Sequence, residues 1–370
     1  MRFSFQDKTV LIVSNVEWSD FQVSKHHYAA TLSTICKKVY YLSPPLLTGR
    51  NKIALSAIDG QNNLIEVKVE LAVPQLVRFQ FYKLYVLYVK RVMRKLKKAL
   101  DDIDLVWSFE HVKYPEIEVF NAPLNIYHPV DQLDDENEMR FANKNDIVLS
   151  CSYDVLEKLK DCKPPKHFIN HGLATPYANI KPRTLNDAKI KVGFVGNLIV
   201  PQIDYHTFTT IIKSHPDLNF YFYGKSDVSD STPDVMKNFV TLIRNSDNCK
   251  LMGVVNPTEL AGEINTMDIM ILCYDMNVMS RGNNSHKILE YLSTGKPIVS
   301  NYIGLYEGSG LLEMLESTDN SKYVELFDNT ILNLRALQSE SESEKRRSFA
   351  LDNTYKKQIK RIEQHLNDLQ

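Results

Sequence analysis

A lysine and a glutamate stand three positions apart in the segment RGNNSHKILEYLSTGKPIVS, residues 281–300. The apolar residues around them recur at the spacing of one helical stripe: Ile288, Leu289 and Leu292. This pattern predicts a short helix that packs its apolar side on a sheet and leaves Lys287 and Glu290 free for chemistry.

The residues on either side of this predicted helix are typical of helix ends. Asn284 or Ser285 suits the N-cap position. Gly295 suits a left-handed stop, and Pro297 prevents the helix from continuing. The helix therefore points its N-terminus at a polar loop.

A helix N-terminus presents unpaired N–H groups and the positive end of the helix dipole, so it can bind a phosphate group. Arg281 and Lys287 place two cations beside this N-terminus. The alternative interpretation is that Lys287 and Glu290 form an exposed i,i+3 pair worth only about a few tenths of a kcal/mol.

The composition is that of an ordinary globular protein. The chain has 370 residues, of which 44% are hydrophobic and 24% are charged, and its net charge is -1. This length predicts two or three domains. The charge balance argues neither for nor against a polyanionic partner.

The five cysteines form no CxxC motif and no close pair with histidine, so they indicate neither a zinc site nor a disulfide framework. A reduced, cytoplasmic setting is the simplest interpretation. The N-terminal apolar run suits a buried strand better than a signal peptide, and no run approaches the ~20 apolar residues of a membrane-spanning helix.

Strand-like runs alternate with helix-like segments along the chain. In the first half the strand-like runs are residues 9–15, 38–44, 104–110, 124–130, 146–152 and 166–172, with a helix at 24–36. The pattern restarts with strands at 189–198, 218–224, 249–255 and 267–274 and helices at 204–214 and 257–266. Such alternation predicts doubly wound parallel sheets.

We expect two Rossmann-like α/β domains joined near residues 174–188. The first covers residues 1–174 and is completed by a returning C-terminal helix within 349–370, and the second covers residues 189–345. The charged run SESESEKRR (339–347) is a solvated linker or an exposed helix start. Ligands of such sheets bind at the carboxyl ends of the strands, so we expect the function in a cleft between the domains.

Four segments of the second half resemble the GT-B glycosyltransferases, specifically the retaining family-4 type that uses nucleotide-sugar donors. They are VGFVGNL (192–198), NFYFYGK (219–225), GVVNPTELAGEINTMDIMILCY (253–274) and SHKILEYLSTGKPIVS (285–300). In the first half, VEWSDFQVSKHHYAATLS (16–33) and IYHPVDQ (126–132) resemble the branch that glycosylates polysaccharide or lipid-linked intermediates at the bacterial envelope.

The resemblance implies a nucleotide-sugar site in the second domain. Glu290 would bind the ribose hydroxyls, and Gly196 and Asn197 match the glycine loop, where the backbone approaches the donor closely. The N–H groups that would hold the diphosphate lie near Ser285, His286 and Lys287. The alternative is a plain turn at Gly196 and helix capping alone by Asn284 and Ser285.

The sequence departs from the family pattern in two places. Gly282 stands where the family has a first glutamate, eight positions before Glu290, so that contact with the donor sugar is absent or comes from Asn283 or Asn284. The Arg and Lys of the family's glycine loop are also missing. Lys225 and Arg281 are the candidates to meet the diphosphate charge, and a solvent-facing cation is the alternative for each.

Fixed dipoles and cations can stabilise a departing diphosphate without a metal, so we expect no metal and no cofactor besides the co-substrate. The DxD match, Asp102 to Asp104, more simply ends a helix. On the acceptor side, three residues at the ends of predicted strands are catalytic candidates: His111, His128 and Asp131. His26 and His27 begin the first helix. A structural role is the alternative for each histidine, and helix capping is the alternative for Asp131.

The segment VRFQFYKLYVLYVKRVMRKLKKAL, residues 77–100, predicts one helix with an apolar side and a cationic side. It carries eight Lys or Arg residues, and no acid lies between Glu70 and Asp101. Such a helix can lie on an anionic membrane, here the inner face of the cell membrane. RNA binding is the rival interpretation, which nothing else in the chain supports, and a helix packed on the first domain is the structural alternative.

These observations favour a glycosyltransferase that acts in polysaccharide or glycoconjugate biosynthesis, with a saccharide or lipid-linked acceptor. A non-hydrolysing sugar-nucleotide epimerase shares the two-domain plan. A non-catalytic glycosyltransferase-like binding subunit would account for the missing first glutamate.

Overall fold

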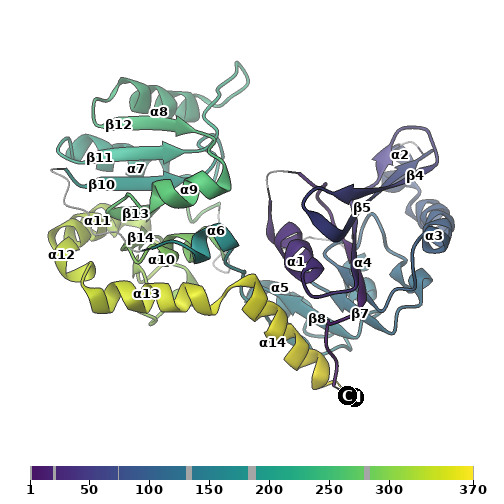
Figure 1. Cartoon of the computed structure of the whole chain (residues 1–370). Coiled ribbons are helices and arrows are strands. Elements are labelled where there is room, and N and C mark those ends of the chain that lie inside the picture. Colours follow the sequence, from purple (N-terminus) through teal and green to yellow (C-terminus); the bar gives the residue numbers. More distant parts are fainter. Residues whose placement is uncertain are drawn as a thin grey trace. The chain divides into compact units, whose positions relative to one another are not determined.

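The computed structural model describes residues 2–19, 22–73, 75–130, 136–181, 189–278 and 284–369. The chain forms two compact units (Figure 1). Unit 1 comprises residues 1–172 together with 355–370, and unit 2 comprises residues 173–354. We describe each unit by itself.

The described part of unit 1 contains a nine-stranded sheet. Its strands are β1 (Thr9–Val13), β2 (Lys38–Leu42), β3 (Leu46–Leu47), β4 (Lys52–Ile58), β5 (Gln61–Leu71), β6 (Leu105–Ser108), β7 (Leu124–Tyr127), β8 (Ile147–Ser150) and β9 (Lys166–Phe168). The spatial order is β3-β5-β2-β1-β6-β7-β8-β9, and β4 pairs with β5. All pairings are parallel except β4 with β5, as the crossover connections of a doubly wound sheet require.

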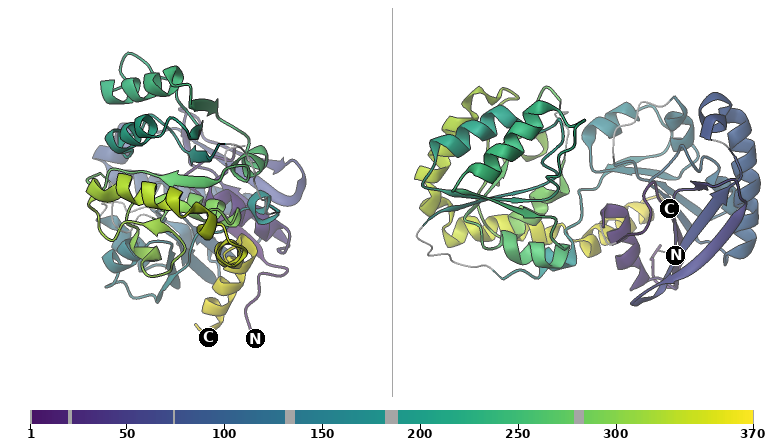
Figure 2. Two further views of the ribbon diagram at one scale, coloured as in Figure 1. Left: turned by 90° about the vertical axis from the view of Figure 1, so that its left-hand side faces the viewer. Right: turned by 90° about the horizontal axis from the view of Figure 1, so that it is seen from above.

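The helices of unit 1 include one that returns from the far end of the chain. They are α1 (Ser24–Ser33), α2 (Gln75–Gln80), α3 (Tyr82–Ala99), α4 (Asn137–Ala142), α5 (Tyr153–Lys158) and α14 (Tyr355–Asn367), with a 3-10 turn at Ile117–Phe120. The ring of Tyr355 on α14 stacks on His27 and meets Tyr28 edge-on. The N–H of Phe3 donates to Asn367 Oδ1 at 2.6 Å, so the two ends of the chain lie side by side (Figure 2).

Unit 2 contains a six-stranded parallel sheet in its described residues. The strands are β10 (Lys191–Val195), β11 (Asn219–Tyr223), β12 (Cys249–Gly253), β13 (Ile269–Leu272), β14 (Ile298–Ser300) and β15 (Glu313–Met314). Their spatial order is β12-β11-β10-β13-β14-β15, which is the 3-2-1-4-5-6 order of a dinucleotide-binding sheet. The strand order reverses between β10 and β13, and such sheets bind ligands there, at the carboxyl ends of the strands.

Helices lie on both faces of this sheet (Figure 2). They are α6 (Thr175–Ala178), α7 (Tyr205–Ser214), α8 (Asp234–Asn245), α9 (Pro257–Ile264), α10 (His286–Ser293), α11 (Tyr323–Leu332), α12 (Leu334–Leu337) and α13 (Glu340–Asp352). Because both faces are covered, the central strands are mostly apolar and buried, and β13 is buried at every position.

The doubly wound α/β fold predicted from the sequence is confirmed, and every predicted strand contains an observed one. The antiparallel hairpin of β4 and β5 was not predicted. Its signal is the alternation in the second half of β5, where Val67, Val69 and Leu71 are buried and Lys68 is exposed.

Two helix predictions need correction. The helix predicted over 77–100 is interrupted at Phe81, which separates α2 from α3 with φ −129° and ψ 50°. The C-terminal helix predicted from 349 is part of two helices, because α13 ends at Asp352 and α14 begins at Tyr355. Of the two interpretations of the run at 339–347, the helix start is correct, since α13 begins at Glu340.

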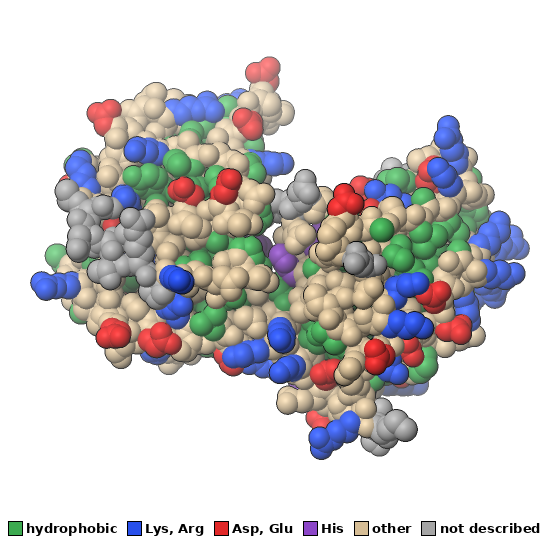
Figure 3. Space-filling model, viewed as in Figure 1, with side chains coloured by type: hydrophobic (Ala, Val, Ile, Leu, Met, Phe, Trp, Pro, Cys, Tyr) green, Lys and Arg blue, Asp and Glu red, His purple; other side chains and the backbone are tan. Residues whose placement is uncertain are grey.

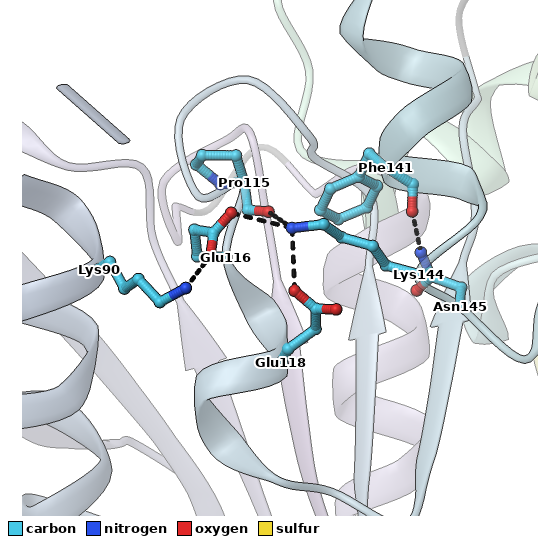
Figure 4. Close-up of polar contacts among 7 residues, drawn as sticks. All are labelled: Lys90, Pro115, Glu116, Glu118, Phe141, Lys144 and Asn145. Atoms are coloured by element: carbon cyan, nitrogen blue, oxygen red, sulfur yellow. Dashed lines mark hydrogen bonds and ion pairs between the residues drawn. The ribbon is translucent and has the colours of Figure 1, made fainter. Parts of the chain in front are cut away.

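A buried carboxylate fastens α3 to the rest of unit 1 (Figure 4). Glu116 accepts hydrogen bonds from Lys90 of α3 at 2.6 Å and from Lys144 at 2.9 Å. Lys144 also contacts the exposed Glu118 at 2.9 Å. Burial raises the pKa of Glu116, but the two lysines outweigh it and leave this pKa below its ordinary value.

We expect Glu116→Gln to lower the free energy of unfolding by about 1–3 kcal/mol at pH 7, since two half-buried ammonium groups lose their charged partner. The native pKa lies below the ordinary value of 4.5, so this stabilisation is complete above pH 4.5 and is lost as the pH falls through the native pKa. Urea unfolding followed by tryptophan fluorescence reports on unit 1, because both tryptophans, Trp18 and Trp107, lie there.

The matched control is Glu118→Gln. Its side chain is 54% exposed although it pairs with the same lysine, so its loss should cost below about 1 kcal/mol. Equal costs for the two variants would contradict the anchoring role of Glu116.

Candidate functional site

Two glycines meet where β10 and β11 end. The N–H of Gly196 donates to the Tyr223 carbonyl at 2.8 Å, and that of Gly224 donates to the Gly253 carbonyl at 2.7 Å. Gly224 has φ +132°, and a Cβ at this position would lie 2.0 Å from the Gly196 carbonyl oxygen. Only glycine permits this approach, so no side chain of Gly196 or Gly224 covers the turn above the strand ends.

Helix α10 begins beside this glycine turn. Ser285 is its N-cap residue with extended backbone angles, and among the described residues its side chain makes no capping hydrogen bond. Gly295 follows the helix with φ +74°, as predicted. The predicted apolar stripe is also confirmed, because Ile288, Leu289 and Leu292 are buried.

A tyrosine of α10 joins the helix to the central strand. Tyr291 is fully buried, and its hydroxyl accepts a hydrogen bond from the N–H of Val195, the last residue of β10, at 2.8 Å. This bond fixes the helix against the end of the strand that leads into Gly196. Tyr291 was not predicted as a site residue, because an aromatic residue on the apolar side of a helix is typical of the core.

Lys287 reaches the glycine turn. Its Nζ lies 3.1 Å from the position that a Cβ of Gly196 would occupy, next to the ring of Phe194. The side chain is half-buried. The structure therefore brings together two predicted site residues, Gly196 and Lys287, at the carboxyl end of β10 and in the first turn of α10.

Glu290 lies on the same helix and is nearly buried, with its side chain 15% exposed. Its carboxyl is hydrogen-bonded to the hydroxyl of Tyr177 on α6, and Oε1 lies 3.8 Å from His286 Nε2. Burial raises the pKa of Glu290 to about 8, although Lys287 and the Tyr177 hydroxyl act in the opposite direction. The interpretation of Lys287 and Glu290 as a solvated surface pair is therefore wrong.

The remaining predicted donor residues surround this centre. Asn197 is exposed and its Oδ1 accepts the N–H of Ile199 at 3.0 Å, which shapes the turn. Lys225 is exposed, and its carbonyl accepts the N–H of Leu198 at 2.8 Å, so its backbone borders the same turn. Asn284 and Ser285 are half-buried and His286 is exposed at the start of α10. Arg281, Gly282 and Asn283 lie outside the described residues.

The sequence matches no protein-family model. It also matches no curated protein. Solved structures, however, match the fold over nearly the whole chain. The sucrose-phosphate synthase of Thermosynechococcus elongatus is 11% identical with a TM-score of 0.70, over 98% of this chain and 99% of that one. The α,α-trehalose 6-phosphate synthase of Burkholderia multivorans is 12% identical with a TM-score of 0.69, over 98% and 96%.

A third match is the HepE protein of Anabaena, solved in complex with UDP and glucose. It is 13% identical with a TM-score of 0.67, over 97% of this chain and 99% of that one. The chain has the GT-B fold. At these identities the likeness extends to the fold alone.

In this GT-B fold, the histidines predicted on the acceptor side lie in the interior of unit 1. His128 is 3% exposed, its ring packs against Trp107 and Phe109, and the Trp107 indole donates to its Nδ1 at 3.3 Å. Burial lowers the pKa of His128 to about 3. His111 is 2% exposed, with its Nδ1 2.9 Å from the Tyr127 hydroxyl. Their surroundings favour the structural alternative.

The histidines of α1 are also engaged. The Nδ1 of His26 accepts the N–H of Val23 at 3.0 Å, and its Nε2 lies 2.8 Å from the Glu17 carbonyl oxygen. Burial lowers the pKa of His27 to about 4, where it stacks on Tyr355. Asp131, the third acceptor-side candidate, lies outside the described residues.

The DxD match lies at the opposite edge of the sheet from the strand carboxyl ends. Asp104 precedes β6, and its Oδ2 accepts the N–H of Thr9, the first residue of β1, at 2.8 Å. Asp104 therefore ties the amino ends of two strands together, which is a structural role.

We expect Glu290→Gln to make the protein more stable at high pH. The native pKa of about 8 lies above the ordinary 4.5, so the stability that Glu290 contributes is fully present below pH 4.5 and is lost as the pH rises through 8. The neutral amide has no such loss. The variant should unfold within about 1 kcal/mol of the wild type at pH 5 and be more stable by roughly 2–4 kcal/mol at pH 9.

Scanning calorimetry at pH 5, 7 and 9 measures this difference. The matched control is Glu259→Gln, an exposed glutamate on α9 of the same unit, which should change the free energy of unfolding by less than about 0.5 kcal/mol. A pH-independent effect of Glu290→Gln would mean that the carboxyl ionises normally in the folded protein.

Proposed function

We propose that this protein is a glycosyltransferase that moves a sugar from a nucleotide-sugar donor to a saccharide or lipid-linked acceptor, and that unit 2 binds the donor. The observation that carries the proposal is the position of Lys287 Nζ above Gly196, where β10 ends and α10 begins. A cation, a bare glycine turn and a helix N-terminus meet there, and together they suit a diphosphate.

In the proposed reaction, Lys287 and the first amides of α10 hold the diphosphate. Negative charge grows on these phosphate oxygens as the bond to the sugar breaks. A fixed cation and fixed dipoles become more favourable as that charge develops, so they lower the barrier more than they strengthen ground-state binding. We propose a retaining reaction without a metal, on the strength of the resemblance noted above.

Glu290 is the proposed ligand of the ribose. Two ribose hydroxyls can donate hydrogen bonds to one carboxylate, and such bonds are stronger when the acceptor is ionised. The Tyr177 hydroxyl donates a hydrogen bond to this carboxyl. Nucleotide binding is therefore expected to favour the ionised form of Glu290 and to lower its pKa from about 8.

The names of the structural neighbours support sugar-nucleotide chemistry. They include sucrose-phosphate and trehalose 6-phosphate synthases and a complex with UDP and glucose. The proposed role in polysaccharide or glycoconjugate biosynthesis, at the inner face of the cell membrane, rests on the first-half resemblance and the basic helix. No helix in the described part of the chain is long and apolar enough to cross a bilayer.

We expect Glu290→Gln to weaken binding of the cognate nucleoside diphosphate by roughly 1.5–3 kcal/mol at pH 9. Wild-type affinity should rise as the pH increases through 8, because the ionised carboxylate is the better acceptor, while the variant's affinity should stay flat. Lys287→Met should reduce kcat more than it reduces affinity. Calorimetric titrations after a thermal-shift screen of nucleotide-sugars measure both.

The matched controls are Glu259→Gln and Lys213→Met, two exposed residues of unit 2, which should leave binding and turnover unchanged. Unaltered affinity in Glu290→Gln would overturn the donor site. Conversion of the nucleotide-sugar into its epimer without an acceptor would instead identify an epimerase. Nucleotide binding without turnover across a wide acceptor panel would identify a binding subunit.

A further inference from the structure

We propose that α2 and α3 form an insertion surface, through which Phe79, Phe81, Leu84 and Leu87 enter an anionic bilayer. Arg91, Arg94, Lys95 and Lys98 would bind the lipid headgroups. This inference rests on the membrane contact in the proposed function and names the side chains that make it.

The apolar half of the insertion surface is exposed at the junction of the two helices. Phe79 is 67% exposed, Phe81 54%, Leu84 59% and Leu87 60%. Exposed large side chains are common singly, but four within nine residues are an unusual concentration of exposed apolar surface. Phe79 lies near the end of α2, and Phe81 is the N-cap residue of α3, so both aromatic residues lie at the junction of the two helices.

The apolar stripe that the sequence predicts on this helix is not available to a membrane. Tyr85, Val89, Met93 and Leu96 make up the apolar stripe of the predicted amphipathic helix, and they are buried in the core of unit 1. A helix that lies on a membrane by that stripe would have to leave the core. The correction therefore moves the contact to the opposite side of the helix.

Along that opposite side of α3, the exposed side chains change from apolar to cationic. Its exposed residues follow at helical spacing: Leu84, Leu87, Arg91, Arg94, Lys95 and Lys98. Leucines occupy the N-terminal part and cations the C-terminal part. In the space-filling view, Lys and Arg side chains gather over the outer side of α3 at the right of Figure 3.

Not every basic residue of α3 belongs to this surface. Lys90 turns toward the protein and pairs with Glu116 (Figure 4), and Lys97 Nζ lies 3.0 Å from the Asn121 side-chain amide. By contrast, no carboxylate among the described residues pairs with Arg91, Arg94, Lys95 or Lys98. These four cations are available to an external anion.

An anionic bilayer fits this gradient better than the other polyanions of a cell. It offers hydrocarbon directly beneath phosphate groups, so one surface can bury apolar side chains and neutralise charge in the same contact. RNA also offers phosphate, and its bases can stack on the rings of Phe79 and Phe81, but Leu84 and Leu87 gain little from it. The buried stripe and the Glu116 contacts hold α3 in place, so the surface exists before a membrane is met.

Flotation with vesicles of phosphatidylcholine alone and with 30% phosphatidylglycerol tests the proposal, using the full chain and three variants. The first replaces Phe79, Phe81, Leu84 and Leu87 with Ser, and the second replaces Arg91, Arg94, Lys95 and Lys98 with Gln. The third is a control that replaces four exposed cations of α7, α12 and α14 with Gln: Lys213, Arg335, Lys356 and Lys360.

We expect the apolar variant to lose at least roughly tenfold in affinity for the anionic vesicles, because buried apolar area is lost. The charge variant should lose roughly a hundredfold or more, since each basic residue contributes to attraction at the surface. The control should bind as the wild type does. All of the substituted positions are exposed, so the variants should fold as the wild type does. Circular dichroism of each variant checks this.

Insertion has its own signature. The Phe81→Trp variant should show a blue-shifted emission and quenching by brominated lipids in anionic vesicles, whereas Leu332→Trp, at an 81% exposed position of unit 2, should not. Wild-type binding by the apolar variant, with no emission shift in the Phe81→Trp variant, would overturn insertion and leave a purely electrostatic contact. Equal affinity for single-stranded RNA and vesicles would overturn lipid specificity.

These results are independent of donor binding. Intact nucleotide binding without flotation would refute the insertion surface and leave the donor site standing. Flotation without nucleotide binding would refute the proposed transferase and keep the membrane contact.

Discussion

The geometry of the candidate site depends on the contact between two backbones at the ends of β10 and β11. Gly224 takes a positive φ of +132° and brings the chain against the Gly196 carbonyl, where a Cβ would lie only 2.0 Å away. Because neither residue carries a side chain, the backbone of the turn is not covered by side chains of its own. The ammonium group of Lys287 fills the space above it.

Helix α10 packs on the sheet by one side and carries a nearly buried carboxyl on another. One side must be apolar to pack on the sheet, and Tyr291 hydrogen-bonds the N–H of Val195 at the end of β10. The other side carries Glu290, whose carboxyl is nearly buried and whose pKa is raised to about 8. A buried carboxyl is costly once ionised, and groups with such shifted pKa values cluster at functional sites. Glu290 therefore lowers the stability of the folded protein when it is ionised, and the same residue makes the proposed contact with ribose.

Helix α3 shows how one amphipathic segment can serve the core and the surface together. Its apolar stripe is buried in unit 1, and Glu116 binds Lys90 from the side. Packing uses the stripe that the hydrophobic period predicts. The opposite, exposed side of α3 carries a second, shorter set of apolar residues followed by cations. Hydrophobic periodicity alone predicts only that this side faces solvent.

The sequence by itself determined the α/β class, the order of the main strands and the limits of α10, because apolar runs, helical stripes and Gly or Pro stops act locally. It also selected Gly196, Lys287 and Glu290 by resemblance. It did not determine that α2 and α3 separate at Phe81 or that α13 ends before Thr354. Only the tertiary structure placed Lys287 over Gly196, paired Glu290 with Tyr177 and buried His128. Distances, burial and pKa depend on residues far apart in the chain, and no local pattern encodes them.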